Sequence, residues 1–227
     1  MKENKLKHIA FIMDGNGRWA KNLKKPRIYG HAEGVKNILQ IVELCIKKEI
    51  EEVSFFAFST ENWNRSKNEV DFLMNLLYKN LSKKTLKKMN QLGVFGRWIG
   101  FENNLSSDLI SRLKFIESES SKFKRNITIN LFFNYSGKQE ILNAIEKAKN
   151  DKEYSEDLEN YLITNSILPI DLLIRTSGEQ RISNFCLYKL AYSEIIFEKS
   201  YWPDYNSDKL IKNIDEYYLR DRRFGKA

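Results

Sequence analysis

The stretch that decides the fold is residues 9–17, IAFIMDGNG, near the start of the 227-residue chain. Its first five residues are apolar, and Asp14 with the glycines that follow ends the run in a turn. A short apolar run that stops at a turn predicts a buried strand. The residues after the turn, from Gly17 and Arg18 onward, predict the start of a helix.

Strands and helices alternate along the rest of the chain. Apolar residues at helical spacing predict helices over 35–46, 70–81, 109–116, 141–148, 187–191 and 210–217, with the second continuing to Met89 as one long helix. Short apolar runs predict further strands over 53–58, 94–99, 127–133, 172–174 and 195–197. Right-handed crossovers between such strands give a mainly parallel sheet covered by helices on both faces. We therefore predict a single α/β domain over residues 1–227, with a central, mainly parallel six-stranded sheet flanked by helices.

Composition fits one sizeable core. Hydrophobic residues make up 42% of the chain, and the 10 glycines and 3 prolines are too few for a collagen-like or linker-dominated protein. The two cysteines, Cys45 and Cys186, are too isolated for a disulfide framework, which favours a reducing, cytoplasmic location. Residues 1–7 are polar and the next apolar run is short, so we expect neither a signal peptide nor a membrane span, and only peripheral contact with a membrane.

The net charge of +8 is concentrated near the start, since residues 1–31 hold eight basic and two acidic residues. Such a field attracts nucleic acid, anionic lipid or a polyphosphate ligand. The basic pI of 9.2, with four Trp and eleven Tyr, is compatible with a nucleic-acid-binding domain. The chain lacks a recognisable nucleic-acid motif, however, so we expect no nucleic-acid partner.

Polar segments follow four of the predicted strands, at 14–18, 59–65, 134–137 and 175–183. Ligands bind beyond the carboxyl ends of the strands in parallel sheets. We therefore expect these segments to form one shared site.

The segment from Asp14 to Trp19 resembles an anion-binding turn. Its glycines allow backbone N–H groups to approach a phosphate, and Arg18 can donate two parallel hydrogen bonds. Asp14 would repel a bare diphosphate, which favours a bridging Mg²⁺. An ordinary Asp-Gly turn explains the same residues equally well. Residues 15–20 also match G-x-G-x-x-A, but no acidic residue ends the second strand where a dinucleotide fold requires one.

Two later segments carry further candidate groups. Residues 59–65 combine hydroxyls, an amide, a carboxylate, an indole and Arg65, although Ser66 and Glu69 also fit a helix-capping box. Residues 175–184 offer two arginines and several hydroxyls, suited to a second phosphate group, or form a surface loop. The two histidines and two cysteines are far apart in the sequence, so only an oxygen-ligated cation is expected.

Taken together, these segments closely resemble the cis-prenyltransferases. The resemblance rests on residues 8–20, 30–31, 58–65, 134–137, 175–185, 202–204 and 222–225, in the family's order and over nearly the whole chain. It departs from the family pattern at Ser66, often Pro, at Gln180, often His or Asn, and at residues 136–138, commonly Gly-Gly-Arg. The D-D-x-x-D metal motif of the trans-prenyl synthases is absent.

The resemblance implies an enzyme that uses Mg²⁺ to condense isopentenyl diphosphate repeatedly onto farnesyl diphosphate with cis double bonds. In the bacterial branch the product is undecaprenyl diphosphate, the precursor of the lipid carrier for cell-wall polysaccharide synthesis. The resemblance also implies a homodimer, with a hydrophobic product tunnel between sheet and helices. By the same resemblance, the arginine-rich tail of one subunit, at Arg220, Arg222 and Arg223, approaches the isopentenyl diphosphate site of the other.

The family pattern also assigns roles to particular residues. Asp14 is expected to be catalytic and to bind Mg²⁺, with Glu194 as the second metal carboxylate. Asn62 is expected to orient a substrate, because an amide is not a credible base at neutral pH. The residues expected around the allylic diphosphate are Gly15, Asn16, Gly17, Arg18, Trp19, Arg27 and His31. The residues expected at the isopentenyl diphosphate are Arg175, Arg181, Ile182 and Ser183. Further substrate contacts are expected from Ser59, Thr60, Glu61, Trp63 and Arg65.

The strand over 53–58 suggests where the product chain enters its tunnel. Strict alternation would place Val53, Phe55 and Ala57 on one face, and Ser54, Phe56 and Phe58 on the other. Ala57 is the small residue near the active-site end, so it could leave room for the prenyl chain or merely permit close helix packing.

Overall fold

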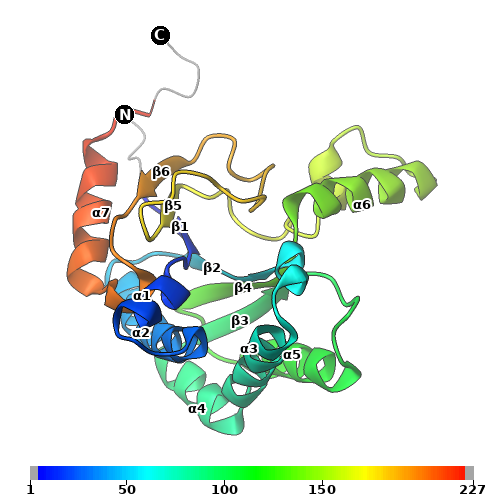
Figure 1. The fold of residues 1–227 in the computed structure, drawn as a ribbon. Coiled ribbons are helices and arrows are strands. Elements are labelled where there is room, and N and C mark those ends of the chain that lie inside the picture. The colour runs from blue at the N-terminus through cyan, green and yellow to red at the C-terminus, as the bar shows by residue number, and fades with distance from the viewer. Residues whose placement is uncertain (1–4, 223–227) are drawn as a thin grey trace.

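Six parallel strands form one sheet in the computed structural model of the chain, which describes residues 5–222 (Figure 1). The order across the sheet is β3-β4-β2-β1-β5-β6, with β1 and β2 in the middle. The strands are β1 (His8–Ile12), β2 (Glu52–Ser59), β3 (Val94–Ile99), β4 (Ile127–Tyr135), β5 (Leu172–Arg175) and β6 (Glu194–Phe197). Every pairing is parallel, so all six carboxyl ends lie at one edge of the sheet.

Helices connect the strands. They are α1 (Asn16–Asn22), α2 (Arg27–Lys47), α3 (Lys67–Asn80), α4 (Lys83–Leu92), α5 (Ser107–Ser120), α6 (Gly137–Asn150) and α7 (Ser207–Leu219), with 3₁₀ turns η1 (Thr60–Asn64), η2 (Leu158–Tyr161) and η3 (Trp202–Asp204). Figure 1 shows α2 to α5 below the sheet, α7 at the left and α6 at the upper right. The predicted α/β domain with a parallel six-stranded sheet is confirmed. None of the helices within residues 5–222 is long and apolar enough to cross a membrane.

The core on the α2 and α7 side of the sheet is rich in aromatic rings. Phe11 of β1 stacks on Phe55 of β2 with 5.4 Å between ring centroids, and Trp202 and Tyr205 pack against them. Trp202 is 1% exposed, and its indole Nε1 donates to the Gly34 carbonyl over 2.7 Å. This packing attaches the segment after β6 to α2, close to the carboxyl ends of the strands.

The opposite face of the sheet differs from the expectation of covering helices. Its buried cluster combines strand residues such as Ala10 and Phe132 with Ile167, Phe185 and Leu190, which lie outside regular helices. Irregular segments therefore cover much of this face.

Two predicted helices are wrong in detail. The predicted long helix over 70–89 is interrupted between α3 and α4, because Leu81 leaves helical geometry and the Ser82 hydroxyl caps a new helix by accepting from the Thr85 N–H over 3.2 Å. The short helix predicted over 187–191 does not form. Only one helical hydrogen bond, from Leu190 N to the Cys186 carbonyl, is made there, and Cys186 itself has a positive φ of 39°.

The alternation predicted for β2 fails at its carboxyl end. The pairing of β2 with β4 shifts register between Phe56 and Phe58. As a result Phe56 packs with Phe185 in one buried cluster, whereas Phe58 packs with Phe133 in another, and Ala57 packs against that same second cluster. The predicted grouping of Phe58 with Phe56 is therefore wrong, and the irregularity places Ala57 beside α3.

Candidate active site

The carboxyl edge of the sheet brings the predicted polar segments together. The Thr176 hydroxyl, after β5, donates to the Asp14 carbonyl, after β1, over 2.7 Å. The Trp63 indole N–H, after β2, donates to Asn134 Oδ1 near the end of β4 over 2.8 Å. The Asn184 amide donates to Glu61 over 2.6 Å. The four predicted segments thus meet at this edge of the sheet.

Asp14 is held at the centre of this edge. Arg175 Nη2 donates to Asp14 Oδ2 over 2.9 Å, and the Gly15 N–H donates to Oδ1 over 2.7 Å. Burial alone would raise the pKa of Asp14, but the hydrogen bonds from Arg175 and Gly15 outweigh burial and hold this pKa below its ordinary value. Asp14 is therefore ionised at neutral pH and keeps a partly exposed carboxylate.

Gly15 makes this geometry possible. Its φ is +98°, and a Cβ there would lie 2.6 Å from the Tyr201 ring and 2.9 Å from Ser177 Cβ. Any larger residue would push the Asp14 turn away from the loop after β5.

Glu179 pairs with two of the predicted diphosphate ligands. Arg18 Nη1 and Arg181 Nη1 each donate to Glu179 over 2.5 Å. Arg18 Nη2 also lies 3.3 Å from Asp14 Oδ1. We call Glu179, Arg18 and Arg181 the Glu179 cluster. The hydrogen bonds from Arg181 and Arg18 lower the pKa of Glu179. Glu179 is not among the site residues predicted from the sequence.

Glu69 pairs with three others. Arg27 Nε lies 3.2 Å from Oε2, while Arg65 Nη1 and His31 Nε2 lie 3.0 and 3.2 Å from Oε1. Burial lowers the pKa of His31, and the nearby Arg65 and Arg27 lower it further against the opposing effect of Glu69. We call Glu69, Arg27, Arg65 and His31 the Glu69 cluster. Sequence reasoning considered Glu69 only as part of a capping box, and no sequence signal linked it to Arg27, 42 residues away.

Arg175, predicted at the isopentenyl diphosphate, lines the cavity at this edge with a buried side chain. Its side chain is only 4% exposed. Besides Asp14, it donates through Nη1 to the Arg181 carbonyl and the Ser183 hydroxyl, over 2.5 and 2.7 Å. Ile182 packs against the core on the second face. Arg175 thus orients Asp14 and the following loop, and Arg181 is the arginine of this loop whose side chain is largely exposed.

The segment after β2 forms η1. Asn62 Oδ1 accepts from the Ser59 N–H over 3.2 Å, while the Ser59 side chain caps the same turn. Thr60 is close enough to hydrogen-bond Glu61 at 3.5 Å. The Asn62 carbonyl oxygen is therefore engaged, and its amide N–H₂ is the group that can donate to a substrate.

Helix α1 and the start of α2 meet closely beside the site. The Trp19 ring stacks on Tyr29 with 5.9 Å between centroids, and its N–H donates to Asp204 over 2.7 Å. A Cβ at Gly17 would lie 2.7 Å from the Arg27 guanidinium. The buried Asn16 Oδ1 has no hydrogen-bond partner among the described residues. Trp19 is thus fixed by packing, and Asn16 retains an unused acceptor.

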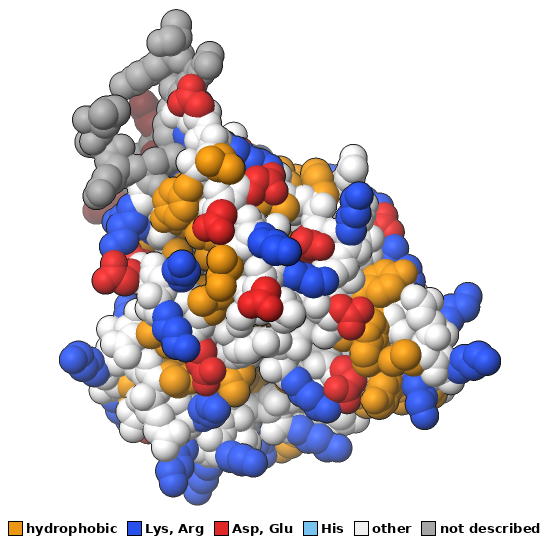
Figure 2. Space-filling model, turned by 90° about the vertical axis from the view of Figure 1, so that its left-hand side faces the viewer, with side chains coloured by type: hydrophobic (Ala, Val, Ile, Leu, Met, Phe, Trp, Pro, Cys, Tyr) orange, Lys and Arg blue, Asp and Glu red, His pale blue; other side chains and the backbone are white. Residues whose placement is uncertain are grey.

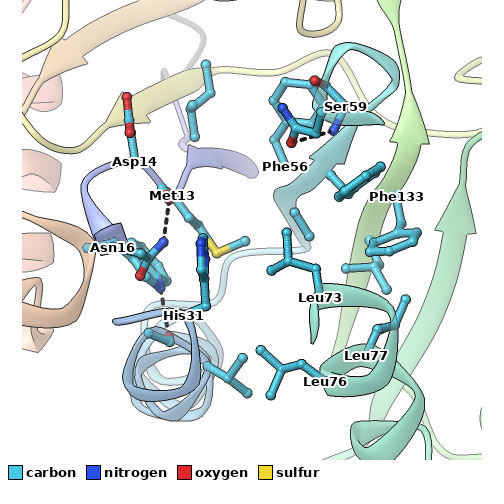
Figure 3. A pocket seen from close by; sticks show the side chains of 18 of the residues that line it. Met13, Asp14, Asn16, His31, Phe56, Ser59, Leu73, Leu76, Leu77 and Phe133 are labelled. Atoms are coloured by element: carbon cyan, nitrogen blue, oxygen red, sulfur yellow. Dashed lines mark hydrogen bonds between the residues drawn. The ribbon is translucent and has the colours of Figure 1, made fainter. Parts of the chain in front are cut away.

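A cavity lies at this edge of the sheet, and a second cavity adjoins it. The first, of about 450 Å³, combines apolar side chains such as Phe133 with polar ones, and we call it the polar cavity after the latter, which include Asp14, Asn16, His31, Asn62 and Arg181. Figure 3 shows Leu73, Leu76 and Leu77 of α3 pointing into it from below Asp14 and Ser59. A larger, apolar cavity of about 1030 Å³ lies between the sheet and α2, α4 and α5. The residues shared by the two linings are Val35, Ile38, Leu77, Asn80 and Leu131.

The side chains at this edge fit a metal ion only if a bound substrate supplies some of its ligands. Within residues 5–222 no group of three or more His, Cys, Asp or Glu side chains is placed to hold a metal ion. Mg²⁺ is commonly bound by one or two carboxylates plus substrate phosphates, and the single ionised Asp14 fits that mode. Glu194 does not join Asp14 within the chain, because it begins β6 opposite Leu172, at the amino end of the strands, and pairs with Arg220 over 2.9 Å.

A family model described as "Putative undecaprenyl diphosphate synthase" matches residues 12–225. The chain belongs to this prenyltransferase family. It is 44% identical over 223 residues to an isoprenyl transferase from Aquifex pyrophilus, covering 97% of this chain and 96% of the relative. It is 39% identical over 235 residues to the farnesyl-diphosphate-specific ditrans,polycis-undecaprenyl-diphosphate synthase of Francisella tularensis, covering 100% and 90% of the two chains.

Solved structures of prenyltransferases share the fold. Lavandulyl diphosphate synthase from Lavandula x intermedia, crystallised with dimethylallyl diphosphate, superposes with a TM-score of 0.92 at 30% identity over 98% of this chain and 99% of that one. A probable undecaprenyl diphosphate synthase from Campylobacter jejuni gives 0.81 at 32% identity over 98% and 100%. The resemblance drawn from the sequence is therefore confirmed for the whole fold, and the chain is a prenyltransferase.

Proposed function

We propose that this prenyltransferase condenses isopentenyl diphosphate repeatedly onto farnesyl diphosphate with cis double bonds, giving undecaprenyl diphosphate. The observation that carries the proposal is the adjacency of two unlike cavities, which share five lining residues. One holds Asp14 with members of both arginine clusters, and the other is apolar and more than twice as large. A diphosphate with a growing apolar tail needs this combination.

The site residues divide the work of such a reaction. The allylic diphosphate, as it leaves C1 of the farnesyl chain, would be held by Arg18 and by three members of the Glu69 cluster, namely Arg27, Arg65 and His31. Arg181 and Ser183 would place isopentenyl diphosphate so that its double bond attacks C1, and loss of a proton from C2 of the attacking unit forms the new double bond. A diphosphate oxygen or water takes that proton, while the Asn62 amide orients the substrate.

Mg²⁺ is part of the proposal. Asp14 is the residue that would hold it, with the remaining ligands supplied by substrate phosphate and water. The ion would neutralise negative charge on the departing diphosphate. Arg175 contributes by keeping Asp14 ionised and oriented.

We also propose that the enzyme acts as a homodimer. Leu142 and Ile145, three residues apart on α6, are 67% and 38% exposed, which leaves an apolar strip for a second copy. Glu194, remote from Asp14 in its own chain, could meet an isopentenyl diphosphate site only across such an interface. Of the expected C-terminal tail, Arg220 and Arg222 contact their own chain, and Arg223 lies outside the described residues. Sedimentation velocity tests the dimer.

Location and purpose complete the proposal. Cys45 and Cys186 are free and buried, as in a protein of a reducing compartment, and we place the enzyme in the cytoplasm. Its product would serve as precursor of the lipid carrier for cell-wall polysaccharide, with peripheral membrane contact during release.

The decisive experiment incubates the protein with labelled isopentenyl diphosphate, farnesyl diphosphate and Mg²⁺ and separates the products by chromatography. We expect a polyprenyl diphosphate of eleven units. If no product forms with Mg²⁺, the proposed function is rejected. If the same amount of product forms after the metal has been chelated, the proposed role of Mg²⁺ is rejected. Replacing farnesyl diphosphate by dimethylallyl diphosphate, the ligand of the lavandulyl enzyme, controls for starter choice.

A further inference from the structure

Helix α4 carries a row of lysines on its outer side. Lys83, Lys84, Lys87 and Lys88 follow the spacing i, i+1, i+4, i+5, which places them on one face of the helix, and all four are exposed. Residues 72–101 include six Lys and Arg residues and no Asp or Glu. Four of the six therefore lie on this one face of α4, within a stretch that holds no acidic residue.

Little in the fold neutralises this face. Lys88 lies 3.8 Å from Glu43, and within residues 5–222 no acidic group lies within ion-pair distance of Lys83, Lys84 or Lys87. Helix α4 lies at the lower end of the molecule in Figure 1, and Lys and Arg side chains project along the lower edge of the space-filling view in Figure 2. Unneutralised charges this close together favour an extended anionic partner.

The lysine face borders the apolar cavity. Lys84, Lys87 and Lys88 stand at the edge of that cavity, whose wall also includes Met89 and Leu92 of the same helix. No residue of α4 is fully buried, and its Met89 and Leu92 both pack against the core and line the cavity. The positive surface and the apolar opening are thus two sides of one helix.

We propose that the α4 lysine face docks on an anionic lipid bilayer and places the opening of the apolar cavity against it. This inference rests on the proposed function, which fills the cavity with a prenyl chain. Moving an apolar chain into water is disfavoured by roughly fourfold for each CH₂ group, whereas moving it into a bilayer is not. Docking therefore gives the finished chain an apolar destination directly beside its cavity.

The observations favour lipid over nucleic acid, the other extended anion. Proteins that bind single strands combine a basic groove with exposed aromatic rings for base stacking. Residues 79–98, all of which the structure describes, contribute no large exposed aromatic side chain. Tyr78, the nearest tyrosine before α4, is covered by the Arg112 guanidinium at 3.8 Å.

The test measures cosedimentation of the full chain with vesicles of a zwitterionic lipid alone or mixed with an anionic phospholipid. The variant K83Q/K84Q/K87Q removes the three unpaired lysines. The control K147Q/K149Q/K152Q removes the same charge from exposed positions at the end of α6 and just beyond it, on the opposite side of the molecule. A lysine near an anionic surface is worth about fivefold in partitioning.

We expect wild type and control to bind the anionic vesicles within threefold of each other, and the α4 variant to bind about 20-fold or more weakly. Three outcomes would overturn the proposal. The first is an equal loss of vesicle binding in both variants, and the second is wild-type binding to zwitterionic vesicles as strong as to anionic ones. The third is displacement of the protein from anionic vesicles by equimolar bulk RNA. Product synthesis by wild type in detergent is assayed separately. If the wild type synthesises product but does not bind anionic vesicles, only the docking proposal is refuted. If it makes no product, the proposed function is refuted, and with it the reason for docking.

Discussion

The Glu69 cluster and the Glu179 cluster use the same chemistry in two different settings. Each has one carboxylate that holds two arginines. The Glu69 side chain is 11% exposed and lies on α3, whereas Glu179 is 26% exposed and follows Gly178, where an added Cβ would meet open space. We therefore expect Glu69 to hold its partners in place before any ligand binds, and the arginines of Glu179 to exchange their carboxylate for a phosphate at lower cost.

The largest effect should come from Asp14, which lines the polar cavity with members of both clusters. Asp14→Ala should lower turnover by ~10³-fold or more, equivalent to about 4 kcal/mol of barrier, because Mg²⁺ loses its only carboxylate there. Steady-state kinetics at saturating Mg²⁺ measures this. Activity within tenfold of wild type, with normal thermal unfolding, would show that Asp14 is not the metal ligand.

The next effect separates the two clusters by substrate. Arg181→Ala should raise KM for isopentenyl diphosphate, and Arg27→Ala should raise KM for farnesyl diphosphate, each by about tenfold or more, since a hydrogen bond to a charged group is worth roughly 1.5–3 kcal/mol. Arg175→Ala should also affect isopentenyl diphosphate more, although it acts through Asp14 and Ser183 and should lower kcat as well. Equal changes for both substrates in every variant would rule out two separate diphosphate sites.

Stability should distinguish the carboxylates themselves. Glu69→Gln should lower the free energy of unfolding by about 1–3 kcal/mol, because Arg27, Arg65 and His31 lose a buried charged partner. Glu179→Gln should leave thermal unfolding unchanged, because its partners turn to water. Denaturant titration of the two variants side by side provides the measurement. A larger loss in Glu179→Gln would reverse the assignment of rigid and exchangeable clusters.

The pH dependence of stability offers a finer comparison. Burial lowers the pKa of His31, so the unfolded chain binds its proton more readily. Stability should therefore be complete above the unfolded pKa of about 6.5 and fall below it, by at most about 1.4 kcal/mol per pH unit for one group. Burial also lowers the pKa of His8. His31→Gln should remove part of this fall and leave the part from His8, and an unchanged slope between pH 7 and 5 would contradict the prediction.

The smallest effect on rate should come from Ala57, which belongs to neither cluster but lines the polar cavity. Ala57→Leu should shorten the products while the first condensation continues, because the added side chain narrows the passage toward α3. Overpacking should cost about 1–3 kcal/mol of stability at most. Full-length product from a destabilised mutant would instead support a packing role.

Sequence reasoning succeeded where the signal was local. The apolar run before Asp14 and the polar segments at strand ends specified β1 and the shared edge, since strand length and turn residues are read from neighbours in the chain. Sequence reasoning failed where a feature depends on residues far away in the chain or on the exact backbone geometry. The register shift in β2 depends on its pairing with β4, and the end of α3 depends on the Leu81 backbone.

The sequence predicted many of the residues that lie at the candidate site, but not the contacts between them. Asp14 and Arg18 were selected by type and position and Arg27 by the family resemblance, while the carboxylates that hold the arginines, Glu69 and Glu179, were not selected. Their role arises from pairs such as Arg18 and Glu179, 161 residues apart in the chain. Arg175 was predicted as a ligand, and its burial against Asp14 emerged only from the fold.

The central place of β1 has a consequence for how the protein is made. Strand β1, which precedes the other five in the chain, pairs on one side with β2 and on the other with β5, and the His8 N–H donates to Asp171, 163 residues later. The nascent chain must therefore keep one edge of β1 unpaired until nearly the whole protein has been synthesised. Such an exposed edge invites aggregation. We expect truncated nascent chains ending before β5 to depend on chaperones, and full-length chains to escape that need soon after release.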